Sequence, residues 1–177
     1  TGDLWDAIEE STGAPARRMM DSWIWQPGFP LVAASISADG RELVLRQSRF
    51  GFTDAASDDP ARWVVPVHVR QVTAAGAEVA KVLLDGNEAR LPLAADAVVV
   101  VNADGPGFYR VAYADALLQR LSGPALAGLS TLERYNLVDD AWSSVVAGRL
   151  GATEFLRFAD GFRDETELAV WQALANG

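Results

Sequence analysis

The sequence predicts a mainly β protein with added α-helices: short N-terminal helices, an antiparallel β-sandwich of seven to eight strands, and then the first helices of a helical array. The observations behind this are two changes of period and the closely spaced turn signals between them. Apolar residues recur at helical spacing, alternate with a period of two from Phe29, and return to helical spacing after Tyr113. Three segments are therefore expected, residues 1–28, 29–113 and 114–177.

Two short helices are predicted before the first strand. Leu4 and Ile8 recur at helical spacing, and Gly13 follows the end of that helix. Pro15 suits the first turn of a second helix, because its fixed φ matches the helical value, and Pro27 stops it. The apolar stripe of the second helix consists of Met19, Met20, Trp23 and Ile24.

The middle of the chain alternates apolar and polar residues, as half-buried strands do. The stretches "PLVAASIS" and "RELVLRQS" flank Asp39-Gly40, so they predict a hairpin with a tight turn. Pro66 and Pro92 lie inside predicted strands, and since proline cannot donate to a β-ladder, we expect edge positions or bulges there. The other predicted strands are "RWVVPVHVR", "EVAKVLLD", "EARLPL", "AVVVVN" and "FYRVAY".

Helical spacing continues from Tyr113 to the last residue. Ser130 or Thr131, followed by Glu133, resembles a helix-capping signal. Because the chain starts at Thr1 in a helix-like stretch and ends in the middle of a helical pattern, we expect it to be a piece of a longer protein. The predicted helices are "ADALLQRL", "STLERYNLVDDAWSSVVAGRL", "ATEFLRFADGF" and "ETELAVWQALA".

Composition excludes several classes of function. The 177 residues carry a net charge of −9, which disfavours nucleic acid and anionic membrane surfaces as partners. Cysteine is absent, so neither disulfides nor thiolate metal sites can form. The longest apolar run, residues 97–101, is far too short to span a bilayer. Arginine supplies all basic residues except Lys81, which suggests a GC-rich bacterial genome, and cytoplasm is the expected location.

The residue types of common catalytic sites are scarce. His68 is the only histidine and lies in an alternating strand, which excludes two-histidine zinc motifs and makes a serine–histidine–acid triad a poor alternative to an ordinary strand residue. Asp139 and Asp140 are neighbours on a predicted helix and point about 100° apart, so solvation or a cap contact is expected rather than a glycosidase pair.

Two loops resemble ligand-binding motifs but lack their full pattern. The stretch "GPGFYR", residues 105–110, begins like a dinucleotide-binding loop, yet a strand follows it where that motif needs a helix, so we interpret it as a turn. The stretch "DAASDDP", residues 54–60, offers three carboxylates without the spacing of a calcium loop, and a solvated loop is the preferred interpretation.

Six tryptophans are many for this length and could form a platform for sugars. Trp23, Trp142 and Trp171 fall on apolar helical stripes, however, which favours packing in the core. Trp25, about 200° from Trp23 around the helix, is not accounted for by this packing. A free-standing β-sandwich that binds carbohydrate or a protein therefore stays open as an alternative.

The order of the elements, together with several motifs, resembles the aminopeptidase N family of zinc metallopeptidases, the M1 aminopeptidases. The similarity includes a helix with Asp-Leu-Trp, a helix with Met-x-x-Trp, and the Gln-x-Gly-Phe-Pro-Leu-Val stretch after them. Val145 stands where the family usually has leucine. The similar stretches are "DLWDAIEESTGAPARRMMDSWIWQPGFPLV", "WVVPV", "NADGPGFYRVAY", "ERYNLVDDAWSSVVAG" and "ETELAVWQAL".

This resemblance implies an architecture more than an activity. Residues 1–28 would be the helical tail of a catalytic domain, residues 29–113 the β-sandwich, and residues 114–177 the start of a helical C-terminal domain. The His-Glu-x-x-His and Gly-x-Met-Glu-Asn motifs of the family are missing, so no catalytic, cofactor-binding or metal residue is assigned, and this chain alone is expected to be inactive. Zinc is implied only for the longer parent enzyme, which would remove N-terminal residues from peptides.

The implied partners are the remaining domains of the same parent, and peptide substrates for that parent. Without those domains, some apolar surface is expected to be uncovered at both ends of the chain and to favour self-association. The residues expected on these surfaces are Trp5, Met20, Phe155, Phe158, Phe162 and Trp171.

Overall fold

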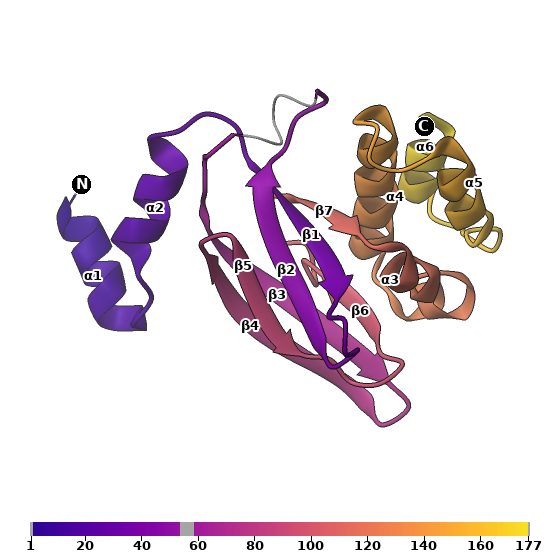
Figure 1. The fold of residues 1–177 in the computed structure, drawn as a ribbon, viewed down its shortest axis with the longest axis horizontal. Helices are drawn as coiled ribbons and strands as arrows, with labels where there is room; N and C mark the ends of the chain where they lie inside the picture. The colour runs from indigo at the N-terminus through magenta and orange to yellow at the C-terminus, as the bar shows by residue number, and fades with distance from the viewer. Residues whose placement is uncertain (1, 54–58, 177) are drawn as a thin grey trace.

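The computed structural model describes residues 2–53 and 59–176. In it a two-sheet sandwich lies between two helices at one end and a group of helices at the other (Figure 1). This order agrees with the fold class predicted from the two changes of period. In the part of the chain described, no helix combines the length and hydropathy needed to cross a bilayer.

The two N-terminal helices form a hairpin that projects from the sandwich (Figure 1). Helix α1 spans Gly2–Thr12 and α2 spans Ala16–Ile24. The Thr12 hydroxyl donates to the Ile8 carbonyl at 2.6 Å, and Gly13 follows with a φ of 68°, a value that glycine adopts without strain. None of the described side chains of α1 is buried, because the main packing partner of α1 is the short helix α2.

The first sheet has the strand order β5-β2-β1-β7. Strands β1 and β2 form the predicted hairpin, with Ala33 opposite Arg46 and Gly40 in the turn at a φ of 75°. Strand β7 pairs with β1 in parallel, with Leu31 opposite Arg110, so the expectation of a purely antiparallel sandwich was wrong for this pair. Alternation along a strand defines its faces but not the direction of its neighbour, and these two strands are far apart in sequence. The bounds are Pro30–Ile36 for β1, Glu42–Arg49 for β2, Glu88–Pro92 for β5 and Arg110–Tyr113 for β7.

The second sheet has the order β4-β3-β6 and is antiparallel throughout. Pro66 lies in β3 where only β4 pairs with it, because β6 pairs with β3 from Val69 to Val72. Pro92 ends β5, which is an edge strand. Both prolines therefore occupy positions that lack a ladder partner on one side, as predicted. The bounds are Val64–Thr73 for β3, Gly76–Asp85 for β4 and Val98–Val101 for β6.

The core of the sandwich is apolar, and one buried amide bridges its sheets. Gln47 in β2 donates from Nε2 to the carbonyls of Trp63 at 2.8 Å and Gly86 at 2.6 Å. Its Oε1 accepts from the Trp63 N–H at 2.9 Å. This amide satisfies three backbone groups that burial would otherwise leave unpaired. The largest fully buried side chains of the sandwich core are Trp63, Leu43, Leu45, Leu84, Val32, Val65, Val67, Val69 and Val99.

The helical group has an apolar core of its own. Ser130 caps its longest helix with the capping box expected from the sequence, since its side chain accepts from the Glu133 N–H and Glu133 accepts from the Ser130 N–H. A 3₁₀ helix, η2, was not predicted. The bounds are Asp115–Arg120 for α3, Gly123–Gly128 for η2, Thr131–Val146 for α4, Ala152–Asp160 for α5 and Leu168–Asn176 for α6.

This second core corrects one expectation about uncovered surface. Phe155, Phe158 and Phe162 are buried against α4 and its neighbours, so they do not form a free apolar face. Helix α5 is amphipathic, and its apolar side finds enough partners within this chain. Trp171 is 45% exposed, so the prediction that it packs in the core was wrong and the expectation that it lies on uncovered surface is confirmed. Trp142 packs against Phe155 with ring centroids 5.3 Å apart.

Candidate functional site

The structural features that point to function are two junctions where helices meet the sandwich. At the first, α2 docks onto the start of β3. Trp23 Nε1 donates to the Val64 carbonyl at 3.1 Å, and the Val64 N–H donates to the Ser22 hydroxyl at 3.0 Å. The Trp23 ring also packs on the buried Trp63, with centroids 6.1 Å apart. Helix α2 is therefore held by directional bonds as well as by apolar contact.

The end of α2 continues this junction. Gln26 donates from Nε2 to the carbonyl of Arg62 at 2.6 Å, which fixes the chain as it leaves the helix. Trp25, on the other side of α2, is 79% exposed, as its helical position indicated. The stretch "WIWQPGFPLV" thus forms a joint between a helix and the first strand.

The second junction joins the sandwich to α4 through two arginines, and the first of them, Arg110, lies in β7. Arg110 Nη1 lies 2.6 Å from Asp139 Oδ2 and 3.0 Å from Asp140 Oδ1. The other oxygen of Asp140, Oδ2, accepts from the backbone N–H of Val111 at 3.0 Å. Asp140 is nine-tenths buried, so it is neither a solvated residue nor a helix cap, and that expectation was wrong for it. Its contact with β7 could not be inferred from its neighbour in sequence.

The buried position of Asp140 changes its acidity. Loss of contact with water raises the pKa of this carboxyl to about 7, and the Val111 N–H and Arg110 lower it by a smaller amount. Both of its carboxyl oxygens are already bound, to Arg110 and to the Val111 N–H. We therefore interpret Asp140 as a structural group of the junction rather than as a catalytic acid.

Glu133 forms a second contact between the sandwich and α4. Its Oε2 accepts from Arg70 Nη2 at 2.6 Å and from the Ser130 N–H at 2.9 Å, while its Oε1 accepts from the Asp104 N–H at 3.0 Å. Burial opposes its ionisation, yet these donors outweigh burial and hold the pKa of Glu133 below its usual value. A single carboxylate thus binds a strand, a loop and the start of a helix.

A row of aromatic rings connects the two junctions. Phe108 packs on Trp23 at 6.3 Å and on Phe29 at 5.4 Å between centroids, and Phe29 stacks on Phe50 at 5.3 Å. Phe29 precedes β1 and Phe108 precedes β7, so the parallel pairing of these strands brings the two rings together. The guanidinium of Arg110 lies 5.5 Å from the Phe50 centroid, within the range of a cation–π contact.

Next to this row lies a cavity of about 280 Å³, which we call the seam pocket. Phe29 and Phe108 line it from the sandwich side, and Leu132, Asn136 and Asp139 line it from α4. The α4 residues are spaced four and three positions apart, so they share one face of the helix. Arg110 and Asp140 also line it, with the bonds described above.

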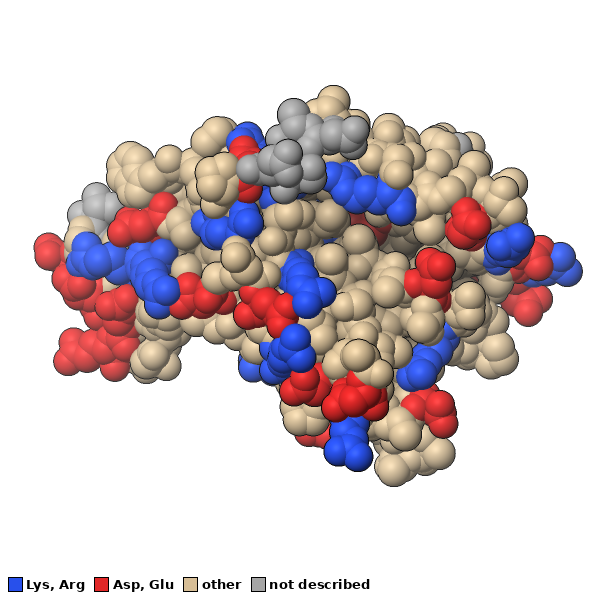
Figure 2. Space-filling model, in the orientation of Figure 1, with Lys and Arg blue, Asp and Glu red and all other residues tan. Residues whose placement is uncertain are grey.

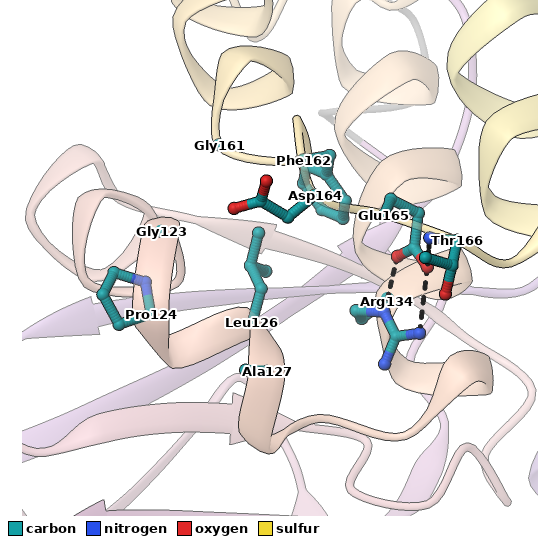
Figure 3. A pocket seen from close by; sticks show the side chains of 10 residues that line it. All are labelled: Gly123, Pro124, Leu126, Ala127, Arg134, Gly161, Phe162, Asp164, Glu165 and Thr166. Carbon is teal, nitrogen blue, oxygen red and sulfur yellow. Dashed lines mark hydrogen bonds and ion pairs between the residues drawn. The ribbon is translucent and has the colours of Figure 1, made fainter.

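A larger cavity of about 430 Å³ lies within the helical group. Figure 3 shows Arg134 and Glu165 facing each other there, joined by two hydrogen bonds, while the Asp164 carboxylate points away from them. Arg134 also donates to the Leu129 carbonyl at 2.6 Å, and Glu165 accepts from the Glu167 N–H at 2.9 Å. These charged groups satisfy one another and fix the start of α6.

The other residues considered from sequence find structural roles or fall outside the description. His68 lies in β3 opposite Lys81 and takes part in no catalytic arrangement among the described side chains. The stretch 105–110 is a turn leading into β7, as interpreted. The possible calcium loop, residues 54–60, lies largely outside the described residues. Within residues 2–53 and 59–176, no group of three or more metal-ligating side chains is close enough to hold an ion.

Sequence reasoning missed the arginines of the second junction. Arg70 and Arg110 look like ordinary polar positions of alternating strands. The capping signal did identify Glu133, and the adjacent carboxylates did draw attention to Asp139 and Asp140. Each of these carboxylates lies some 30 to 60 positions in sequence from the arginine that binds it, and no local pattern indicates such a pairing.

The charges on the face shown in Figure 2 are unevenly distributed. Acidic side chains gather over α1 at one end, whereas acidic and basic side chains are mixed over the sandwich and the helical group. This face therefore presents no continuous basic surface for a nucleic acid backbone.

Comparison with known proteins gives a consistent result. A model of the ERAP1-like C-terminal domain family matches residues 98–177, a range that begins in β6 and includes the helical group. The chain is 29% identical to the puromycin-sensitive aminopeptidase of Caenorhabditis elegans, over 100% of this chain and 19% of that protein. It is 31% identical to aminopeptidase M1-A of rice, Oryza sativa subsp. japonica, over 96% of this chain and 20% of the relative.

A third relative comes from an archaeon. The tricorn protease-interacting factor F2 of Thermoplasma acidophilum is 30% identical over 98% of this chain and 20% of its own length. The chain thus spans about a fifth of the length of the curated relatives that it matches.

Proposed function

Because the chain belongs to the M1 aminopeptidase family, we propose that it forms a non-catalytic segment that fixes the position of neighbouring domains in a zinc-dependent aminopeptidase. In this proposal the longer enzyme removes N-terminal residues from peptides, and the sandwich holds the helical group and the N-terminal helices in register. The observation that carries the proposal is the Arg110 contact with Asp139 and Asp140, which joins β7 to α4.

The geometry supports an organising role for a physical reason. Apolar contact alone lets two packed units slide, whereas charge-assisted hydrogen bonds require fixed directions. The second junction has two such contacts, at Arg110 and at Arg70, and the first has the bonds of Trp23 and Ser22 to β3. Each contact joins a helix to the sandwich near the end of a helix or a strand. A rotation of the helices relative to the sandwich would break it.

Zinc belongs to the proposed enzyme and not to the described part of this chain. With a single histidine and no cluster of metal-ligating side chains among the described residues, these residues do not fit a zinc site. No hydrolytic step is therefore assigned to them. In the proposed enzyme the catalytic residues and the metal come from other parts of the protein.

The experiment that tests this proposal is a transplant into a relative. The aligned fifth of rice aminopeptidase M1-A is replaced by this chain, and the release of leucine from leucine p-nitroanilide is measured. We expect the chimera to be active and the same chimera with Arg110→Met to lose most of its activity. A chimera with Arg157→Met, which changes an exposed arginine of α5, is the matched control.

Two results would contradict the proposal. Equal activity of the Arg110→Met and Arg157→Met chimeras would mean that the junction does not organise the enzyme. Leucine release by the 177-residue chain alone, with zinc added, would mean that the chain is itself catalytic.

Self-association of the isolated chain remains part of the proposal, and of the two surfaces expected from the sequence we keep the one on the N-terminal helices. Since the phenylalanines of α5 are buried, the α1–α2 hairpin is the better candidate, because Leu4, Ile24 and Trp25 are exposed on it. We expect the mass measured by light scattering to rise toward that of a dimer as the concentration rises. The Ile24→Glu variant should stay monomeric. A constant monomer mass over the whole range would exclude it.

A bacterial source is also proposed from the strong arginine bias, and a cytoplasmic location is proposed as the default expectation. Fractionation of the cells that produce the protein would test the location. Recovery of the protein outside the cytoplasm would contradict it.

One observation favours a second candidate function, a binding module for carbohydrate or protein. Trp25 and Phe108 are 79% and 73% exposed, and aromatic side chains in such positions can stack on sugars. Quenching of tryptophan fluorescence by acrylamide, with and without glycans, tests it. Protection by a glycan would support the binding module, and unchanged quenching would speak against it.

A further inference from the structure

We propose that the seam pocket binds an apolar ammonium, such as an arylalkyl amine, between its aromatic rings and the carboxylate of Asp139. The cavity of about 280 Å³ suits a ligand of this size. No part of the aminopeptidase proposal assigns a ligand to this pocket.

The walls of the pocket supply the apolar half of the recognition. Phe29 and Phe108 meet with ring centroids 5.4 Å apart, and Leu132 faces them from α4. Phe108 is 73% exposed, so its ring is open to a ligand at the mouth of the pocket. A phenyl group could pack on these side chains, and a cation near the ring faces would gain a cation–π contact.

The polar groups determine the sign of the ligand's charge. The pocket lining holds two carboxyl groups, of Asp139 and Asp140, and one guanidinium, of Arg110. Because burial raises the pKa of Asp140 to about 7, the pocket has its full excess of negative charge only above that pH. Asp140 already binds Arg110 with one oxygen and the Val111 N–H with the other. Asp139 binds Arg110 through Oδ2 and its side chain is 41% exposed, so its second oxygen can accept from a ligand N–H.

Asn136 adds a neutral acceptor beside this carboxylate. It lies one turn before Asp139 on α4 and lines the same pocket. An ammonium has three donors, so Asp139 and the Asn136 carbonyl could bind two of them and water the third. A carboxylate or phosphate ligand would instead be repelled by Asp139.

The test is an NMR titration of the whole chain with 2-phenylethylamine. We expect saturable shifts of the backbone amides of Phe108 and of α4 from Leu132 to Asp140. The isosteric 2-phenylethanol and the anionic 3-phenylpropionate, which lack the ammonium, are expected to bind at least about fivefold more weakly, the ratio that roughly 1 kcal/mol produces. A dipeptide amide, Phe-Ala-NH₂, then tests whether a peptide amino terminus can replace the free amine. Its N-acetyl form, which has no ammonium, is the control for that test.

Variants make the assignment specific. Asp139→Asn should weaken amine binding about fivefold or more, because it removes the charge and keeps the shape. Phe108→Ala should weaken it too, and because this ring is 73% exposed, we expect the variant to keep the fold. Asp164→Asn, a matched change at the larger cavity, should leave binding unchanged.

The proposal fails if the amine causes no saturable shifts at these amides. It also fails if the alcohol or the anion binds as well as the amine, or if Asp139→Asn and Phe108→Ala both bind the amine like the unchanged chain.

Discussion

Arg70 Nη2 lies 2.6 Å from Glu133 Oε2, and this pair joins the middle of the second sheet to the first turn of α4. The Glu133 side chain is 1% exposed and that of Arg70 is 17% exposed, so water screens their interaction little. The carboxylate also completes the capping box of α4 and binds the Asp104 N–H. Folding of α4 and its docking on the sandwich therefore depend on the same residue.

Replacing this carboxylate should destabilise the chain strongly. Glu133→Ala leaves two backbone N–H groups unpaired and leaves Arg70 with only the longer contact to Asp104 at 3.7 Å, so we expect the free energy of unfolding to fall by roughly 3 kcal/mol. Urea denaturation followed by circular dichroism measures this. Ser130→Ala removes only the cap and should cost about 1 kcal/mol. Similar losses for the two variants would show that the contact with Arg70 contributes little.

The lowered pKa of Glu133 leads us to expect a loss of stability in acid. The pKa of Glu133 is lowered by its donors despite burial, and that of Glu165 is lowered chiefly by Arg134. Since the unfolded chain then binds more protons than the folded chain, stability is present above the usual glutamate pKa and is lost as pH falls through the lowered values. We expect the melting temperature to drop steeply below about pH 4. In Glu133→Gln the drop should be shallower, and an unchanged profile would contradict this origin.

Asp139 and Asp140 share an arginine but should differ in their effect on stability. Asp140 is nine-tenths buried and binds Val111 N–H as well as Arg110, whereas Asp139 is half exposed. Asp140→Ala should cost about 3 kcal/mol of unfolding free energy, and Asp139→Ala at most about 1 kcal/mol. Chemical denaturation of both variants checks this. The reverse order would mean that the exposed carboxylate carries the junction.

Asp140 also predicts a pH dependence of the opposite sign. Burial raises its pKa to about 7, so the folded chain binds more protons than the unfolded chain between the usual aspartate pKa and this value. Its contribution to stability therefore falls as pH rises through that window. The free energy of unfolding should decline from about pH 4 to about pH 7, and Asp140→Asn should flatten this decline. A variant that declines as steeply as the unchanged chain would overturn the assignment.

Gln47 should contribute as much to the free energy of unfolding as a large apolar side chain of the core does. Its amide pairs with both the N–H and the carbonyl of Trp63 and with the Gly86 carbonyl, across the two sheets. Gln47→Ala leaves these buried groups unpaired, and we expect a loss of roughly 3 kcal/mol in unfolding free energy. Gln71→Ala is the control: it removes two exposed bonds, to the Pro92 carbonyl and from the Ala94 N–H, and should cost under about 1 kcal/mol because water can replace them. Comparable losses would show that the amide is not a bridge between the sheets.

Much of the architecture could be predicted because it depends on local patterns. The strands around Pro66 and Pro92 and the capping box at Ser130 are where spacing and residue type placed them. Burial of Phe155 and its neighbours was missed, because a helix stripe identifies an apolar side but not which part of the chain covers it. Trp171 was assigned to the core for the same reason, and it is half exposed.

The sequence by itself determined the order of helices and strands, the absence of cysteine chemistry and of a two-histidine zinc motif, and the resemblance to the M1 family, because these depend on residue type and short spacing. Only the tertiary structure decided which way β7 runs beside β1. That parallel pairing places Phe108 beside Phe29 and directs Arg110 to Asp139 and Asp140. Contacts between residues far apart in sequence arise from packing, and no local pattern of the chain records them.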